Sequence, residues 1–180
     1  VGRPGRRDAR QVAALHFAAS MPYMRHRLAG GTGSDPVGDM LADAFPASLP
    51  GKRIVDALAS RGVAPDAAAA RVLDAWVVGM ADPYAHALAL AARPSPRPRA
   101  SAVARWQAPR APIVTNLRHI GVRLADDFAR KLLPLCDGTR TAGDLAAAAR
   151  DSVPAAEAAQ PQAAVERRLA QFASAALLEA

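Results

Sequence analysis

The side chains that most often carry out nucleophilic or metal chemistry are few in this sequence, which contains one cysteine and four histidines. No two histidines stand at i and i+4 with a carboxylate in phase, so the spacing does not predict a zinc site. Cys136 stands at the end of an expected helix, where the negative end of the helix dipole disfavours a thiolate. We therefore expect Cys136 to be an inert core thiol, and we expect no catalytic residue and no metal site in this chain.

A glycine-rich segment, Gly30-Gly31-Thr32-Gly33, has the composition of a loop that could cradle a cofactor phosphate. Such a loop works when a buried strand leads into it and a helix N-terminus follows it, so that free amides face the anion. The preceding residues include Arg25 and Arg27, which a buried parallel strand would not carry, and no clear helix start follows. Residues 1–36 are thus predicted to form a short helix, interrupted at Pro22, and a flexible loop that binds no cofactor.

Acidic and other polar side chains gather later in the sequence. Asp126 and Asp127 are adjacent and thus project to different sides of a helix, which fits helix capping better than paired acid and base catalysis. The polar set most worth attention is Thr115, Asn116, Arg118, His119, Asp137, Thr139 and Arg140. We expect Arg118 to pair with Asp137, and His119 to hydrogen-bond the strand and the linker together. These residues would lock a strand-to-helix corner, and contact with a ligand is the alternative.

The middle of the chain, residues 93–112, contains prolines at positions 94, 96, 98, 109 and 112. Proline forbids a regular helix or a central strand at those points, so the segment is predicted to be an inter-domain linker. Trp106 lies within it, and a large aromatic side chain left in water would be an exposed apolar liability. We expect Trp106 to be buried against a domain surface, and a role in binding is the alternative.

Residues 37–92 predict a first small unit. A short helix ends at Gly62, which can adopt positive φ, and Asp66 is expected to cap a longer helix. Asp82-Pro83 should then turn the chain, and residues 84–90 alternate in hydropathy with the period of two expected for a strand. Helix, turn, helix and strand in this order are the outline of a winged helix.

Residues 113–180 predict a second unit of the same kind. Its turn at Asp137-Gly138-Thr139-Arg140 is followed by Thr141 and Asp144, which nearly match a capping box at the start of a helix. The last helix has apolar residues at helical spacing, namely Val165, Leu169 and Phe172. The sequence thus predicts a mainly α protein with small β-sheets, an α+β fold of two winged-helix-like units joined by a Pro/Arg-rich linker.

The formal net charge is +7, and it comes almost wholly from arginine. Such a charge could serve to bind nucleic acid or an acidic partner. The densest arginine clusters lie in the expected N-terminal tail and the linker, where charge usually belongs to solvated segments, so we expect no nucleic-acid surface. A single cysteine excludes an intramolecular disulfide, and no window approaches the roughly 20 apolar residues that a membrane span needs. We expect a cytoplasmic protein without a membrane span.

Between Arg97 and Leu145 the sequence reads RPRASAVARWQAPRAPIVTNLRHIGVRLADDFARKLLPLCDGTRTAGDL. This run resembles the C-terminal part of bacterial proteins that carry a methyltransferase regulatory region, the protein lysine methyltransferase-like family, where a linker enters a winged-helix domain. The matching residues are Arg97-Pro98, Ala100-Ser101, Ala104 to Ala108, Val114 to His119, Leu132 to Leu135 and Asp137 to Arg140. In that family a domain that binds S-adenosylmethionine comes first, and nothing of that kind precedes the match here.

The resemblance implies a non-catalytic regulatory or substrate-recognition module at the C-terminus of an S-adenosylmethionine-dependent methyltransferase-like protein. Its partner would be a protein, either the methyltransferase domain or a protein substrate, and S-adenosylmethionine would be bound only by a separate catalytic domain. The start at Val1, without methionine, is consistent with a fragment of a longer protein.

Two other functions stay open. A winged-helix DNA-binding protein would present a basic recognition helix, whereas the expected helix from Leu145 to Ala149 is almost uncharged. A peptide-binding winged-helix module would use an open strand edge, for which residues 114–117 or the C-terminal strand are candidates.

Overall fold

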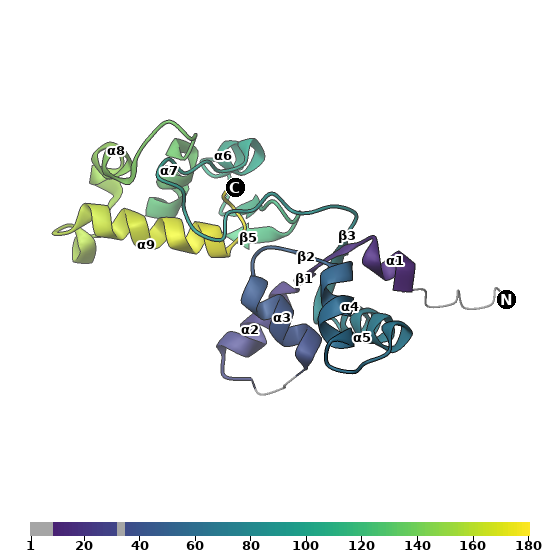
Figure 1. The fold of residues 1–180 in the computed structure, drawn as a ribbon. Coiled ribbons are helices and arrows are strands. Elements are labelled where there is room, and N and C mark those ends of the chain that lie inside the picture. The colour runs from purple at the N-terminus through teal and green to yellow at the C-terminus, as the bar shows by residue number, and fades with distance from the viewer. Residues whose placement is uncertain (1–8, 32–34) are drawn as a thin grey trace. The chain divides into compact units, whose positions relative to one another are not determined.

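The computed structural model describes residues 9–31 and 35–180 of the chain. The chain folds into two compact units, Val1–Leu88 and Ala89–Ala180. Helices predominate and the sheets are small, as the α+β prediction requires (Figure 1). Each unit has its own hydrophobic core. The predicted fold class is therefore confirmed.

The first unit contains a three-stranded antiparallel sheet in the order β2-β1-β3. Its elements are α1 (Ala9–Ala13), β1 (His16–Ala19), α2 (Met21–Leu28), α3 (Pro36–Ala44), β2 (Leu49–Pro50), α4 (Gly51–Ala59), α5 (Pro65–Val77) and β3 (Ala81–Tyr84). Helices α4 and α5 are the helix-turn-helix pair, and Gly62 between them has the positive φ expected of it, 85°. The N-terminal strand β1 lies at the centre of the sheet, between the strands that precede and follow this pair.

Residues 9–28 differ from the single interrupted helix that was predicted. Phe17, Ala18 and Ala19 of β1 are completely buried, because the strand has a neighbour on each side and a core beneath it. Pro22 does not interrupt a helix but stands in the first turn of α2, where a missing N–H costs nothing. Ser20 caps this helix by accepting a hydrogen bond from the Tyr23 N–H.

Other predicted boundaries of this unit are also wrong. The strand expected at residues 84–90 is β3, which ends at Tyr84, and Asp82-Pro83 lies inside it instead of forming a turn. Proline is tolerated there because β3 is an edge strand. Asp66 stands inside the first turn of α5 and is not the cap, whereas Asp35 caps α3 by accepting hydrogen bonds from two backbone amides.

The second unit has a related arrangement, in which isolated bridges take the place of the three-stranded sheet and a hairpin follows the first helix. Its elements are α6 (Ala102–Gln107), β4 (Ile113–Thr115), β5 (Gly121–Arg123), α7 (Asp127–Leu135), α8 (Ala142–Ala148), the 3-10 turns η1 (Arg150–Ser152) and η2 (Ala155–Glu157), and α9 (Pro161–Ser174). Strands β4 and β5 form an antiparallel hairpin. Isolated bridges join Arg99 to Asp137 and Ala100 to Leu178. The chain before α6 therefore lies between the segments that flank the helices α8 and α9, which are the helix-turn-helix pair of this unit.

The expected linker, residues 93–112, therefore differs from the structure, where it lies within the second unit. Helix α6 forms between Pro98 and Pro109, which leave room for a short helix, and Ser101 caps it through the Ala104 N–H. Ala100, Ala104 and Ala108 are fully buried in the core of the unit. The prolines limit the length of the helix but do not prevent it.

The buried face of α9, the start of α8 and the turn that leads into α8 agree with the sequence. The apolar residues predicted for the last helix, Val165, Leu169 and Phe172, are buried in α9. Thr141 and Asp144 form a complete capping box at the start of α8. Gly138 has a φ of 88°, as its place in the turn requires.

Gly51 generates a stability prediction, because a Cβ at this position would lie 2.0 Å from the backbone oxygen of Val12. We expect Gly51→Ala to destabilise the first unit by about 1 to 3 kcal/mol, since backbone atoms must shift to accept the methyl group. Thermal or urea unfolding followed by circular dichroism measures the loss. Gly143→Ala is the matched control, because the nearest atom, the Thr141 Oγ1, would lie 3.8 Å away. Equal unfolding curves for Gly51→Ala and the parent would contradict the close approach.

Candidate functional site

Asn116 holds the tip of the β4-β5 hairpin. Its side-chain oxygen accepts hydrogen bonds from the backbone N–H groups of Arg118 and Ile120, each at 2.9 Å. Its side-chain nitrogen donates to the Ala175 oxygen at 2.9 Å, at the end of α9. Because Asn116 is buried, all of these bonds replace bonds to water. The residue therefore fixes both the turn and its attachment to α9.

His119 and Arg118 take places in this turn other than those expected. His119 has a φ of 59°, and its side chain is exposed, so its part in the turn is the hydrogen bond from its backbone N–H to the Asn116 oxygen. Arg118 is buried, and its backbone N–H belongs to the Asn116 turn. The expected pair between Arg118 and Asp137 is absent, because the ion-pair partner of Asp137 is Arg140, three residues later, with Arg140 Nη1 and Asp137 Oδ2 2.5 Å apart.

Asp137 organises the turn before α8. Its Oδ1 accepts hydrogen bonds from the backbone N–H and the hydroxyl of Thr139, and its Oδ2 accepts from Arg140. These bonds from Thr139, together with the Arg140 guanidinium, lower the pKa of Asp137 to about 2. Arg140 also donates to the Leu135 oxygen at the end of α7. The turn residues Asp137, Thr139 and Arg140 thus bond mainly with one another and with the end of α7.

An ion pair that the sequence analysis missed joins the start of α7 to α9. Both carboxylate oxygens of Asp126 accept from Arg168, at 3.1 and 2.7 Å. The Arg168 side chain is only 11% exposed, and its guanidinium lies 5.5 Å from the ring centre of Phe128. Burial acts to raise the pKa of Asp126, but the Ala129 N–H and Arg168 outweigh it, so the pKa is lowered. No local sequence signal marks this pair, because its members are far apart along the chain.

Cys136 is completely buried, and its thiol donates to the Leu132 oxygen. Burial and the nearby Asp137 raise its pKa to about 12, so the thiolate is scarce at neutral pH. Among the described residues no group of three or more histidine, cysteine or acidic side chains could hold a metal ion. Thr32 and Gly33 of the glycine-rich loop lie outside the described residues, and the element before that loop is the helix α2.

Trp106 is 62% exposed, contrary to the expected burial. Val103, one turn earlier on α6, is 56% exposed, so both side chains lie on the solvent face of this helix. The Arg110 guanidinium lies 4.6 Å from the Trp106 ring centre, and its Nη1 donates to the Trp106 oxygen. This contact is a cation–π interaction. Solvent exposure of a tryptophan in a small domain indicates an interaction surface more than a core.

The β4-β5 hairpin lies beside α6, because the Gln107 side chain donates to the Thr115 hydroxyl and accepts from the Thr115 N–H. Ile113 of β4 is 48% exposed and is paired across the hairpin with Arg123, so the two side chains share a face. We call the set Val103, Trp106, Arg110, Ile113 and Arg123 the Trp106 surface.

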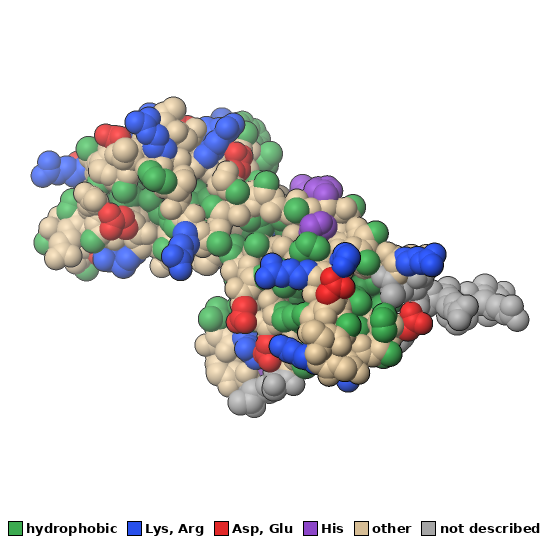
Figure 2. Space-filling view, viewed as in Figure 1, with side chains coloured by type: hydrophobic (Ala, Val, Ile, Leu, Met, Phe, Trp, Pro, Cys, Tyr) green, Lys and Arg blue, Asp and Glu red, His purple; other side chains and the backbone are tan. Residues whose placement is uncertain are grey.

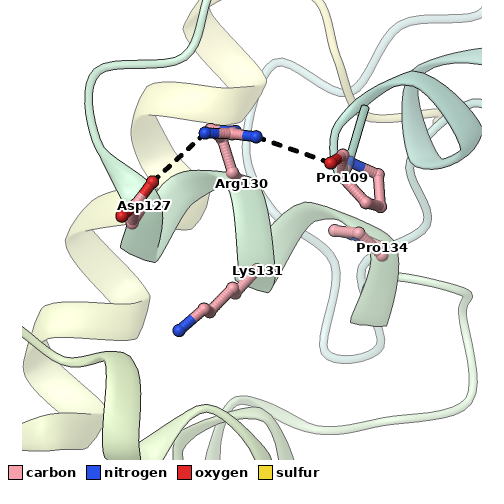
Figure 3. A pocket seen from close by; sticks show the side chains of 5 residues that line it. All are labelled: Pro109, Asp127, Arg130, Lys131 and Pro134. Carbon is pink, nitrogen blue, oxygen red and sulfur yellow. Dashed lines mark hydrogen bonds and ion pairs between the residues drawn. The ribbon is translucent and has the colours of Figure 1, made fainter. Parts of the chain in front are cut away.

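A groove of about 410 Å³ begins at Pro109, next to Arg110 in the sequence. Asp127, Arg130, Lys131 and Pro134 of α7 complete its lining. Arg130 bridges the groove by bonding to Asp127 and to the Pro109 oxygen, whereas Lys131 points away from this pair (Figure 3). The groove thus combines two proline rings with a cationic rim.

On the face seen in Figure 2, positive charge does not form one continuous patch. On the visible side of each unit, lysine and arginine side chains alternate with hydrophobic and acidic ones (Figure 2). In the described part of the chain, no helix has the length and hydropathy needed to cross a membrane.

Comparison with known proteins gives a family match within the second unit. Residues 96–177 match the model of the PKMT C-terminal winged helix domain. The structure of PKMT2 from Rickettsia typhi is similar with a TM-score of 0.59 at 16% identity, covering 79% of this chain and 33% of that one. The same protein in complex with AdoHcy gives a TM-score of 0.60 at 16% identity over 82% of this chain and 34% of that one.

At this identity the likeness to the solved structures shows the fold alone. This chain spans about a third of their length. No curated protein matches the sequence. The predicted resemblance is confirmed.

The Asn116 turn leads to a prediction about stability. Asn116→Ala leaves the backbone N–H groups of Arg118 and Ile120 and the Ala175 oxygen without their partner, so we expect a loss of about 2 to 3 kcal/mol in the free energy of unfolding. Trp106→Ala, in contrast, should change it by less than about 1 kcal/mol, because the side chain is mostly exposed. Chemical unfolding of both variants measures the difference. A Trp106 variant less stable than the Asn116 variant would show that our assignment of the two roles is wrong.

The lowered pKa of Asp137 predicts a dependence on pH. The carboxylate is more acidic in the folded state than its ordinary value of 3.8, so its stabilising bonds are complete above that pH and are lost as the pH falls toward 2. We expect the melting temperature of the parent to exceed that of Asp137→Asn at pH 6, and the difference to shrink between pH 4 and 2. Asp151→Asn is the control, because Asp151 is exposed and forms no ion pair with the residues that the structure describes. A difference that does not change with pH would contradict the role of the charge.

Proposed function

We propose, from the match of residues 96–177 to the model of the PKMT C-terminal winged helix domain, that the chain is a non-catalytic, protein-recognition module of a protein lysine methyltransferase. In this proposal S-adenosylmethionine is bound by a separate catalytic domain, and the module brings a protein substrate or the catalytic domain into position. The proposal includes a cytoplasmic location, where protein substrates and S-adenosylmethionine are both available.

The exposed Trp106 carries this proposal. In a domain with few aromatic residues, a tryptophan that is 62% exposed contributes little to the core. Tryptophan and arginine are the side chains that dominate binding energy in protein interfaces, and here Arg110 stacks on Trp106. The other polar residues considered as site candidates, Asn116, Asp137 and Arg140, bond mainly with their own turns and support the fold.

DNA binding receives less support. The second helix of the helix-turn-helix pair is the one that enters a DNA groove, and in the second unit this is α9 rather than residues 145–149. Its two arginines are engaged, Arg167 with Glu157 and Arg168 with Asp126. The corresponding helix of the first unit, α5, contains two aspartates and a single arginine. Neither helix offers the free basic face that phosphate contacts need.

Peptide binding by strand addition also receives less support. The Thr115 N–H is bonded to the Gln107 side chain, and the Leu117 N–H is bonded to the Ala176 oxygen. The C-terminal strand is flanked by residues 99–100 on one side and by residues 90–91 on the other. The two edges expected to accept a peptide are thus occupied in this part of the structure, which favours recognition through side chains.

Methylation assays test the proposed function. The chain is produced together with the S-adenosylmethionine-binding domain that the proposal assigns to the same protein, and that domain is also produced alone. Transfer of tritiated methyl groups to protein lysine is then measured. We expect loss of the chain to lower kcat/KM for the protein substrate about tenfold, equivalent to about 1.4 kcal/mol, while the affinity for S-adenosylmethionine stays the same.

Two results would contradict the proposal. One is an unchanged kcat/KM when the chain is removed, because the module would then recognise nothing that matters for methylation. The other is saturable binding of S-adenosylmethionine to the chain alone in isothermal titration.

A further inference from the structure

The Trp106 surface carries positive charge that is not neutralised by neighbours. Arg110 and Arg123 are exposed, and within residues 9–31 and 35–180 neither forms an ion pair with an acidic side chain. Arg110 donates one hydrogen bond, from Nη1 to the backbone oxygen of Trp106, so its other N–H groups can bind a ligand. Apolar side chains that alternate with unpaired arginines on one surface suit a partner that is both apolar and acidic.

The neighbouring groove adds two more basic side chains, Arg130 and Lys131. Arg130 is partly offset by Asp127, but Lys131 on the same helix has no acidic partner in the described structure. Only one acidic residue lines the groove, against two basic ones. The rings of Pro109 and Pro134 provide an apolar lining beside these charges. A carboxylate of an extended peptide would find a cation here as well as at Arg110.

We propose that the Trp106 surface, together with the adjoining groove, binds an acidic peptide segment of a protein that carries at least one large apolar side chain. The apolar side chain packs on Trp106, Val103 and Ile113, and the carboxylates pair with Arg110, Arg123 and Lys131. This inference rests on the proposed recognition function and names the chemistry of the partner.

A protein segment fits this surface better than a nucleic acid does. Three exposed apolar side chains contribute to binding only if the partner covers them with apolar surface, which a phosphate backbone does not supply. The cations are few and border apolar residues, whereas DNA binding requires many phosphate contacts. The surface is small, so the affinity of a short peptide should be modest and should weaken as salt screens the charges.

Direct titration tests the proposal on the full chain. The probe is a fluorescent peptide in which a central Leu-Phe pair is flanked on both sides by Glu and Asp. Two further probes replace either the acidic residues by Lys or the Leu-Phe pair by Ala-Ala. We expect saturable binding of the first probe only. A random DNA duplex of equal charge is added as a competitor and should not displace it.

Variants locate the binding site. We expect Trp106→Ala and Arg110→Glu each to raise the Kd of the acidic probe about tenfold or more, as removal of an interface tryptophan or arginine commonly does. Trp76→Ala is the matched control for the tryptophan, because Trp76 is 50% exposed in the first unit. Arg150→Glu is the matched control for charge, because Arg150 is exposed and lies in η1. Both controls should bind like the parent, and melting curves verify that every variant is folded.

Several outcomes would overturn the proposal. Equal binding of the lysine probe would exclude charge complementarity, and equal binding by Trp106→Ala and Arg110→Glu would exclude this surface. Displacement of the probe by the DNA duplex would assign the surface to nucleic acid.

The two proposals fail in different ways. If removal of the chain lowers methylation but no acidic probe binds, only the peptide inference is wrong. If the probe binds at Trp106 but methylation is unaffected by the chain, only the proposed function is wrong.

Discussion

Each unit is held together by an extended segment from its N-terminal part, which pairs on both sides with segments that are distant in the sequence. In the first unit β1 separates β2 from β3. In the second, Ala100 donates its backbone N–H to the Cys136 oxygen, while the Arg99 oxygen accepts from the Glu179 N–H. Without the central strand, the ends of the helix-turn-helix pair would have unpaired backbone groups. Small side chains of these central segments, Ala19 and Ala100, are completely buried in the cores of their units, where little space is left beside the helices.

This constraint explains why the proline-rich segment belongs to the second unit. A free linker would leave Ala100 in water, but here it is completely buried. Ser101 is the last residue of the central segment and also the N-cap of α6. The position of the central segment therefore determines where α6 begins. Ala104 of α6 and the C-cap residue Ala108 are buried, and the opposite face of α6 carries Trp106. The exposure of the tryptophan is thus a consequence of the alanines that pack beneath it.

The polar residues of the second unit serve two different purposes. Asn116 and Asp137 each bind backbone amides of their own turn, and such closed sets of hydrogen bonds have little capacity left for a partner. Arg110 and Lys131, in contrast, retain donors that no acidic side chain in the described structure accepts. We therefore distinguish structural from binding residues by their remaining hydrogen-bonding capacity, and this capacity favours the proposed recognition surface on α6 over one on the turns.

The sequence by itself determined the features that depend on near neighbours. The buried face of α9, the capping box of Thr141 and the positive φ of Gly138 each involve residues within a few positions, so spacing and side-chain type were sufficient. The resemblance of the run around Trp106 also identified the winged-helix family. Only the tertiary structure decided the exposure of Trp106, the pairing of Asp126 with Arg168 and the central place of β1. These features depend on contacts between segments far apart in the chain, whose geometry leaves no periodic signal in the sequence.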